Sequence, residues 1–491
     1  MPETIPEQSS IRIEKKTFIT AFLILVLLIV TVGILTQIIP TGSYDRIVLD
    51  GREVLVNGTY HLTDVSRFPI WRWFTAPIEV LWSADAPVII VIIFFLLAIS
   101  AAFSLLDRSG VMSYVITLVV QKYGHVKYQF MAVIILIFML MGAFLGTFEE
   151  NIALVPLMIA LAYCLGWDSL VGLGMSILAS CFGFTAAIMN PFSIAITQQI
   201  AELPLYSGTV YRIIIFVCYY TLLYLFLMNY AKNIEKDPTR SLVYADDEQL
   251  RNRYRQTDVT AALLNDNINQ KLVRKASISF GISLLMLTFI IGLASVIAFL
   301  ADLTLPLIGL CLLSGGYVAA KITGLKHRDL LRVILKSFLG IAPGIVLILL
   351  AMSVKFIISN GGIMDTILYY TANTMLGTSP YLAVLLIYGL ILMLELFVGS
   401  SSAKAFLVMP LIAPLADLIG VTRQTAVLAF CFGDGFSNVI YPTNPVLLIC
   451  LGLTVVSFPK WFKWTYKLQL CALIMACIFL FIGVAISYGP F

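Results

Sequence analysis

The stretch from Gly142 to Asn190, GAFLGTFEENIALVPLMIALAYCLGWDSLVGLGMSILASCFGFTAAIMN, contains the features that decide the fold. Two adjacent carboxylates, Glu149 and Glu150, lie at a turn between two apolar arms. A charge at membrane depth costs about 2.5–3.5 kcal/mol on insertion scales, so charges there usually serve a function. The stretch ends in Asn190-Pro191, a helix breaker inside another apolar run.

A second stretch about 250 residues later has the same organisation. Its turn is Gly399-Ser-Ser-Ser-Ala-Lys404, and its interrupted run is CFGDGFSNVIYPTNP at 431–445. Further matches lie at nearly the same spacing: SGVM (109–112) with GGIM (361–364), Pro156-Leu157 with Pro410-Leu411, and LASCFG (178–183) with LAFCFG (428–433). Three matches in register indicate an internal repeat rather than chance similarity between apolar segments.

Composition places the chain in a membrane. Of its 491 residues, 60% are hydrophobic and only 12% are charged, against about 25% charged in soluble domains. We therefore expect an all-α polytopic membrane protein with the lipid bilayer as its environment. A net charge of +4 is too small to suggest nucleic acid, and there is no GxxxxGK[ST] sequence to bind ATP. With three histidines and no CxxC pair, the sequence suggests neither an enzyme nor a metal centre.

Hydropathy predicts nine membrane crossings and two hairpins. The hairpins are 129–165 and 380–416, whose arms of about 15–17 residues are short for a core that needs about 20. Residues 111–123 and 362–376 are short, semi-polar helices, and 40–86 is a polar loop. The crossings are 18–39, 87–106, 168–203, 210–231, 276–299, 304–322, 337–358, 422–456 and 466–487, of which 168–203 and 422–456 are broken.

Loop charges orient these crossings. The loop 232–275 has nine Lys and Arg against seven Asp and Glu, and the basic loop 323–336 lies on the same side. Basic loops mark the cytoplasmic side, so we expect a cytoplasmic N-terminus, an outside C-terminus and a place in the cytoplasmic (inner) membrane. The first hairpin then enters from inside and the second from outside. Inverted repeats with broken helices are typical of secondary transporters.

The polar groups at the turns and breaks are the candidate substrate ligands. Exposed helix ends bind anions at N–H groups and cations at C=O groups. The acidic turn suits a positive group, although a glutamate paired with an internal cation is the alternative. The serine turn suits a carboxylate, with Lys404 neutralising it or instead pairing with Glu395. The candidates are Thr147, Glu149, Glu150, Asn151, Asn190, Ser400, Ser401, Ser402, Lys404, Asp434, Asn438, Thr443 and Asn444, and for Asp434 helix capping is nearly as plausible.

Both charge signs at the predicted site favour a zwitterionic or cationic amino acid. A dicarboxylate would gain nothing from Glu149 and Glu150 unless they were protonated. The alternative is a carrier of C4-dicarboxylates or another small organic anion, coupled to Na⁺ or H⁺. Exchange needs no ion and no cofactor, whereas Asn151, Asn190 and Asp434 with nearby carbonyls offer a place for Na⁺, and a glutamate could carry H⁺.

The acidic turn, the Asn-Pro-Phe sequence, the segment from Gly399 to Pro445 and the linker KNIEKDPTRSLVYADDEQ carry a family resemblance. They resemble carriers of the YfcC type, within the C4-dicarboxylate anaerobic carrier family of the ion transporter superfamily. The resemblance covers residues 18–488. It implies an elevator-type transporter with a scaffold and a moving transport domain, usually a homodimer, and an amino acid, in this branch basic, or a small organic anion as substrate.

This resemblance divides the chain into seven parts. The scaffold comprises 1–110, with the N-terminal tail and external loop, and 276–358. The arms are a cytoplasmic helix at 111–127 and an external helix at 359–378. The transport domain comprises 128–231 and 379–491, and the cytoplasmic linker 232–275 joins the two repeats.

Overall fold

The protein is a multi-pass helical membrane protein. The structure, a computed structural model, describes residues 15–49, 52–63, 67–248, 250–251, 267–294 and 303–489. Within these residues, nine helices are long and apolar enough to cross a membrane. Seven fall on predicted crossings, and the predicted crossings 276–299 and 422–456 are not among the nine. Of the other two, Thr117–Leu145 joins the end of the predicted short helix 111–123 to the first hairpin, and Ser401–Ile419 lies in the second hairpin. The number of predicted crossings therefore equals the number of membrane-length helices in the described residues, but the two sets of segments differ.

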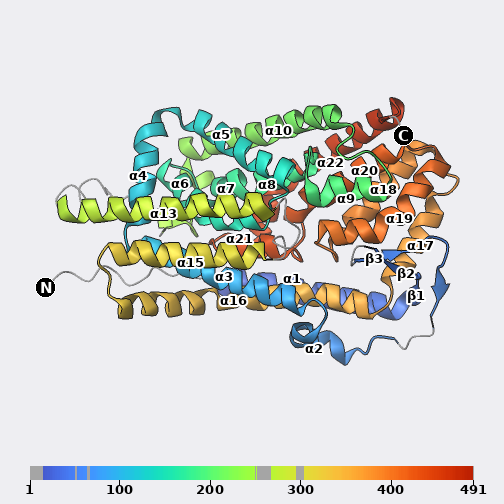
Figure 1. Ribbon diagram of the computed structural model, residues 1–491, viewed down its shortest axis with the longest axis horizontal. Helices are drawn as coiled ribbons and strands as arrows, with labels where there is room; N and C mark the ends of the chain where they lie inside the picture. Colours follow the sequence, from blue (N-terminus) through green and yellow to red (C-terminus); the bar gives the residue numbers. More distant parts are fainter. Residues whose placement is uncertain are drawn as a thin grey trace.

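Five long helices run side by side and form what we call the straight layer (Figure 1). They are α1 (Lys15–Ile38), α3 (Ala86–Arg108), α13 (Asn267–Ala294), α15 (Thr304–Ile322) and α16 (His327–Asn360). Small residues let α3 and α15 approach closely, since a Cβ added at Gly316 would lie 3.0 Å from the carbonyl oxygen of Ala102. Close packing of this kind holds helices together in lipid, which is as apolar as the side chains themselves.

Two helices of the straight layer begin earlier than predicted. α13 starts at Asn267 rather than at residue 276, and α16 at His327 rather than at residue 337. Hydropathy marks only the part of a helix inside the membrane, whereas a helix also continues into water where polar side chains cover it. The predicted loop 323–336 therefore shrinks to 323–326. Residues 295–299 of the predicted crossing 276–299 lie outside the described residues.

The first predicted hairpin and broken helix form where the sequence places them. The helix α4 (Val111–Tyr123) runs crosswise to α13 and α15 (Figure 1). The outgoing arm is α5 (Lys127–Leu140) with a π-helical turn (Met141–Leu145), and the return arm is a 3-10 turn (Glu150–Leu154) with α6 (Val155–Cys164). The broken helix comprises α7 (Ser169–Leu173), a π-helical turn (Gly174–Leu178), α8 (Ala179–Ala186), a second π-helical turn (Pro191–Ala195) and α9 (Ile196–Ile200); α10 (Thr209–Lys236) follows.

The second half repeats this order of elements. After α17 (Met364–Met375), the hairpin consists of α18 (Pro380–Glu395) and α19 (Ser401–Ile419). The broken helix comprises α20 (Arg423–Asp434), a 3-10 turn (Phe436–Val439) and α21 (Pro445–Gly452), followed by α22 (Phe458–Ala485), which begins eight residues before the predicted crossing 466–487. We call α5–α10 and α18–α22 the broken-helix bundle; it forms the upper part of Figure 1.

The segment between α1 and α3, predicted as a polar loop, contains regular elements. β1 (Gly42–Ser43) pairs antiparallel with β4 (His61–Leu62), with Gly42 opposite Leu62, and β2 (Arg46–Leu49) pairs antiparallel with β3 (Arg52–Leu55), with Arg46 opposite Leu55. α2 (Trp71–Glu79) and a 3-10 turn (Val80–Trp82) follow. These strands are too short to show an alternating pattern in the sequence.

The same segment is attached to α17 through one carboxylate. Asp365 accepts hydrogen bonds from the backbone N–H of Tyr44 at 2.9 Å and from the guanidinium of Arg46 at 2.8 Å. Beside it, the rings of Tyr60 and Tyr369 stack with their centroids 4.0 Å apart. Asp365 is buried, so the ion pair and the stacked rings together fix α17 to the strands.

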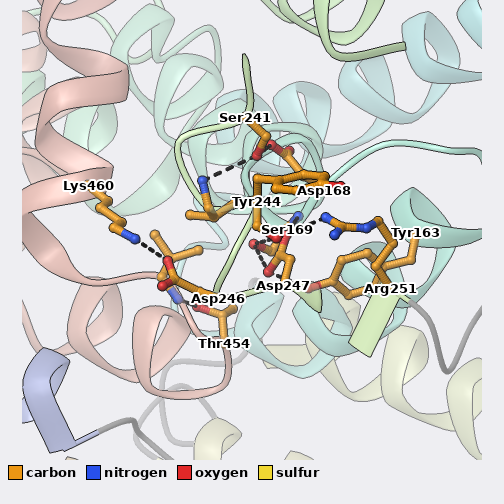
Figure 2. Close-up of polar contacts among 12 residues, drawn as sticks. Tyr163, Asp168, Ser169, Ser241, Tyr244, Asp246, Asp247, Arg251, Thr454 and Lys460 are labelled. Atoms are coloured by element: carbon orange, nitrogen blue, oxygen red, sulfur yellow. Dashed lines mark hydrogen bonds and ion pairs between the residues drawn. The ribbon is translucent and has the colours of Figure 1, made fainter. Parts of the chain in front are cut away.

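The chain after α10 folds back onto the broken-helix bundle, as Figure 2 shows. Asp247 accepts hydrogen bonds from the backbone N–H and the hydroxyl of Ser169, each at 2.9 Å, and from the hydroxyl of Tyr163 at 2.7 Å. Asp247 is fully buried, and its partners lie at the end of α6 and the start of α7. The first part of the predicted linker is therefore packed against the first hairpin.

Two further carboxylates hold this segment. Asp168 accepts hydrogen bonds from the hydroxyls of Tyr230 at 2.6 Å and Ser241 at 2.7 Å, and Asp246 pairs with Lys460 of α22. The segment thus ties together the end of α10, the start of α7 and the start of α22.

The docking of this segment is expected to depend on pH. Burial, with a smaller contribution from the Asp168 carboxylate, raises the pKa of Asp247 to about 7. An undocked segment would return Asp247 to an ordinary value of about 4, so the docked state binds the proton more tightly. Docking is therefore strongest below about pH 4 and weakens as the pH rises to about 7. Amide exchange of 241–251, corrected for intrinsic rates, should be slower at about pH 5.5 than at about pH 8.

Matched variants separate Asp247 from its neighbour. Asp247→Asn should remove most of the difference between the two pH values, whereas Asp246→Asn, which removes the ion pair with Lys460, should leave that difference in place. Equal protection of the wild-type segment at both pH values would contradict the assignment.

Candidate functional site

The two breaks lie against each other in the centre of the broken-helix bundle. A Cβ added at Gly435, where α20 ends, would collide with the backbone and side chain of Thr185 in α8. No other residue fits this contact without moving one of the two helices. The predicted site residues of the two repeats are thereby brought into one region, since each hairpin turn packs beside its own break.

At both breaks, a predicted ligand residue caps a helix. Asn190 Oδ1 accepts the backbone N–H groups of Phe192 at 2.8 Å and Ser193 at 3.2 Å. Asn444 Oδ1 likewise accepts those of Val446 at 3.0 Å and Leu447 at 3.2 Å. Asparagine is among the best capping residues because its side chain takes N–H groups that the helix leaves unpaired.

The amide nitrogens of the same two residues are also bonded. Asn190 Nδ2 donates to the carbonyl oxygen of Gly142 at 3.2 Å, which fixes the first hairpin to its break. Asn444 Nδ2 donates to Asn438 Oδ1 at 2.8 Å, and Asn438 Nδ2 in turn donates to the backbone carbonyl of Asp434 at 2.5 Å. These three asparagines are buried, so they position the freed backbone.

The turn of the first hairpin is held by Asn151. Its Nδ2 donates to the carbonyl oxygen of Thr147 at 2.9 Å and to the hydroxyl of Ser180 in α8 at 2.7 Å. Gly146 begins the turn with φ of +68°, a left-handed conformation that glycine adopts without strain. Asn151 Oδ1 is buried, and no partner for it lies among the described residues.

The adjacent glutamates differ in their surroundings. Glu150 is half-buried, and its Oε2 accepts the backbone N–H of Phe148 at 3.2 Å, so it stabilises its own turn. Glu149 is exposed. Of the two, Glu149 is therefore the more accessible carboxylate.

Two of the serines in the second hairpin turn already form hydrogen bonds within the protein. Ser401 donates its hydroxyl to Asp434 Oδ2 at 2.5 Å, and Ser400 accepts the backbone N–H of Ala403 at 3.4 Å as the N-cap of α19. Ser400 is exposed, whereas Ser401 and Ser402 are half-buried. The N-terminus of α19 thus remains accessible beside the exposed Ser400.

The strongest electrostatic feature is a fully buried charge cluster behind this turn. Lys404 Nζ lies 2.8 Å from Asp434 Oδ1 and also pairs with Glu395. All three side chains have no exposed surface. The pairing with Glu395 that the sequence left open is therefore present, and Asp434 joins it. One ammonium between two carboxylates leaves the cluster one negative charge in excess when all three are ionised.

Sequence reasoning did not count two charged residues as part of the site. Glu395 ends α18 and completes the cluster around Lys404. Arg212 of α10 is fully buried and donates to the carbonyl oxygens of Ile188 at 3.1 Å and Ser207 at 2.6 Å. Its position in the predicted crossing 210–231 could have identified it, because an arginine in a membrane span needs partners inside the protein.

Thr443 lies in the second break. It is buried, and its hydroxyl has no partner among the described residues. No group of three or more His, Cys, Asp and Glu residues suited to a metal ion lies in the described ranges. Of the three suggested sodium ligands, Asn190 Oδ1 already accepts two N–H groups and Asp434 pairs with Lys404, whereas Asn151 Oδ1 has no partner among the described residues.

Residues 18–485 match the family described as "C4-dicarboxylate anaerobic carrier". The chain therefore belongs to this family of membrane carriers, as its resemblance predicted, and it is a secondary transporter of a small molecule rather than an enzyme.

Two curated relatives are similar to the chain. The chain is 30% identical over 378 residues to the "Putative basic amino acid antiporter YfcC" of Escherichia coli K12, which covers 76% of this chain and 73% of that protein. It is 26% identical over 392 residues to a protein of Haemophilus influenzae known only as "Uncharacterized protein", with 80% and 75% covered.

Two solved structures show a loose likeness. They are the YdaH transporter of Alcanivorax borkumensis (TM-score 0.40, 97% of this chain and 100% of that chain) and MtrF of Neisseria gonorrhoeae (TM-score 0.41, 94% of each chain). Each is 16% identical to this chain, a likeness too weak to place individual residues.

The buried charge cluster predicts an ordered effect on stability. Lys404→Met leaves Glu395 and Asp434 facing each other without a cation, and breaking a buried pair costs about 3–5 kcal/mol. Glu395→Gln retains the Lys404–Asp434 pair and should lower the melting temperature less. Thermal melting of the purified protein in detergent measures both. Equal melting temperatures for the wild type and Lys404→Met would show that the cluster does not hold the helices together.

Proposed function

We propose that the protein exchanges a small basic amino acid, of the arginine or ornithine type, across the cytoplasmic membrane. The observation that carries this proposal is the charge balance where the two repeats meet. Asp434 and Glu395 share a single ammonium, Lys404, and the two glutamates of the first turn, Glu149 and Glu150, form no ion pair among the described residues. A cationic group of the substrate would compensate the excess negative charge, and we infer that the exposed Glu149 receives it.

The α-carboxylate of such a substrate has a separate place. The accessible N-terminus of α19 offers unpaired backbone N–H groups beside the exposed Ser400. Anions are stabilised at helix N-termini by these groups and by the helix dipole. A zwitterion with a cationic side chain would therefore be held at both ends by opposite partial charges.

We also propose the elevator motion implied by the family. In this view the broken-helix bundle is the transport domain, the straight layer is the scaffold, and α4 and α17 are the arms between them. The repeated order of hairpin, broken helix and long helix supports two repeats, and the basic loops support their opposite orientation. A homodimer, joined through the scaffold, completes the proposal by the same resemblance.

The alternative substrate is a C4-dicarboxylate or another small organic anion, carried with Na⁺ or H⁺. The family's description and the accessible N-terminus of α19 favour it. Against it, neither Lys404 nor Arg212 is free for a second carboxylate, because Lys404 is paired with Asp434 and Glu395 and Arg212 donates to backbone carbonyls. Proton coupling would need one carboxylate of the cluster to take up a proton.

The matched pair Glu149→Gln and Glu150→Gln tests the substrate class. If Glu149 receives the substrate cation, losing a charge-assisted hydrogen bond of about 1.5–3 kcal/mol should weaken binding roughly 10–150-fold. Glu150→Gln should weaken it less, because Glu150 bonds its own turn. Binding and exchange of labelled arginine, ornithine and succinate in proteoliposomes measure these effects. Normal arginine affinity in Glu149→Gln, or succinate outcompeting every amino acid, would favour the alternative.

Cysteine labelling tests the proposed orientation. In a background without the eight native cysteines, Asn57→Cys and Ser359→Cys should react with a membrane-impermeant thiol reagent added outside. Glu248→Cys should react only after the membrane is opened. All three positions are exposed, so access rather than burial decides the result. Labelling of Glu248→Cys in sealed cells would refute the inverted orientation of the repeats.

A further inference from the structure

A cavity outside the central site lies between α4, α13, the end of α3 and the return arm α6. Its volume is about 420 Å³, and its lining is mainly apolar. The residues that define it include Leu106, Val111, Val115, Leu157, Ile278 and Leu284. Leu157 belongs to the broken-helix bundle and Ile278 to the straight layer, so a molecule in this cavity would touch both.

The cavity opens beside a cluster of cations on α13. Arg274 lines this cavity and also a neighbouring one of about 490 Å³, which Lys271 and Lys275 line as well. All three cations are exposed, and no carboxylate among the described residues forms an ion pair with them. Residues three and four positions apart share one face of a helix, so the three cations form a single patch.

The two features form a continuous stripe along α13. Arg274 lies at its basic end, and Ile278, Gly281 and Leu284 follow at helical spacing along the apolar cavity. At about 1.5 Å per residue, Arg274 and Leu284 are separated by roughly 15 Å along the helix. This equals about half of a ~30 Å hydrocarbon core, the depth of one leaflet.

We propose that this groove binds an anionic phospholipid of the cytoplasmic leaflet. Its phosphate would lie against Lys271, Arg274 and Lys275, and an acyl chain would fill the cavity between α4 and α13. A soluble anion would have no use for the apolar cavity, whereas a zwitterionic lipid would place its own cation beside three positive side chains. Basic pockets between helices on this side of a membrane are suited to anionic headgroups.

Two variants alter the two halves of the groove separately. Replacing Lys271, Arg274 and Lys275 together by glutamine removes the charges. Gly281→Leu fills the cavity instead; a Cβ at Gly281 meets no atom within 4 Å, so the larger side chain fits without disturbing α13. The matched controls are Lys321→Gln, Lys326→Gln and Arg328→Gln combined, which are exposed cations elsewhere, and Gly389→Leu, at another glycine with open space.

Native mass spectrometry of the full chain, mixed with phosphatidylglycerol and phosphatidylcholine of identical acyl chains, measures the retained lipid. The wild type should retain phosphatidylglycerol at least about tenfold more than phosphatidylcholine. The triple glutamine variant should lose that preference, and Gly281→Leu should lose retention of both lipids. The two controls should behave as the wild type.

Three results would overturn the proposal. Equal retention of the two lipids by the wild type would remove the role of charge, and unchanged retention in Gly281→Leu would place the lipid elsewhere. Displacement of phosphatidylglycerol by inorganic phosphate alone would identify a site for a free anion. If the triple variant is not monodisperse, the single variant Arg274→Gln and Gly281→Leu provide the same comparison.

Discussion

The backbone groups freed where two membrane helices break must find partners inside the protein, and the rest of the structure depends on this constraint. Lipid offers no hydrogen bonds, so each unpaired N–H or C=O group there costs several kcal/mol. Asn190 and Asn444 take the N–H groups after each break, while Arg212 and Asn438 donate to carbonyls before it. The hairpins pack where they do because their turns complete this network.

The buried cluster around Lys404 adds a second level of organisation. Its ammonium joins α18 through Glu395, α19 through its own backbone and α20 through Asp434. Transferring charges from water into the protein interior costs free energy, and only close, well-oriented partners offset this cost. The outgoing arm, the return arm and the broken helix of the second repeat are consequently held as one unit, which is what a body that moves without deforming requires.

The sequence revealed the turns and breaks because proline, glycine and charge are conspicuous in apolar runs. Both breaks, both turns and the short helices α4 and α17 lie within a few residues of their predicted places. Contacts between distant segments could not be predicted from the sequence, because no local pattern marks them. Examples are the contact of Asp365 with Arg46, 319 residues apart, and that of Asp247 with Ser169. The sequence also could not distinguish a ligand residue from a helix cap. An asparagine before proline gives the same sequence pattern whether or not its side-chain oxygen accepts hydrogen bonds from the following helix.

The two repeats attach the return arm of the hairpin to the broken helix through different kinds of contact. In each, the first turn of the return arm sends a side chain to the broken helix: Asn151 to Ser180 in the first, and Lys404 to Asp434 in the second. A neutral contact in the first repeat leaves Glu149 without a cationic partner among the described residues, whereas the ionic contact in the second uses its lysine internally. The unpaired carboxylate thus lies in the first repeat, and the accessible helix N-terminus in the second. This division of charge, rather than either repeat alone, is the basis on which we propose a substrate with both a cation and a carboxylate.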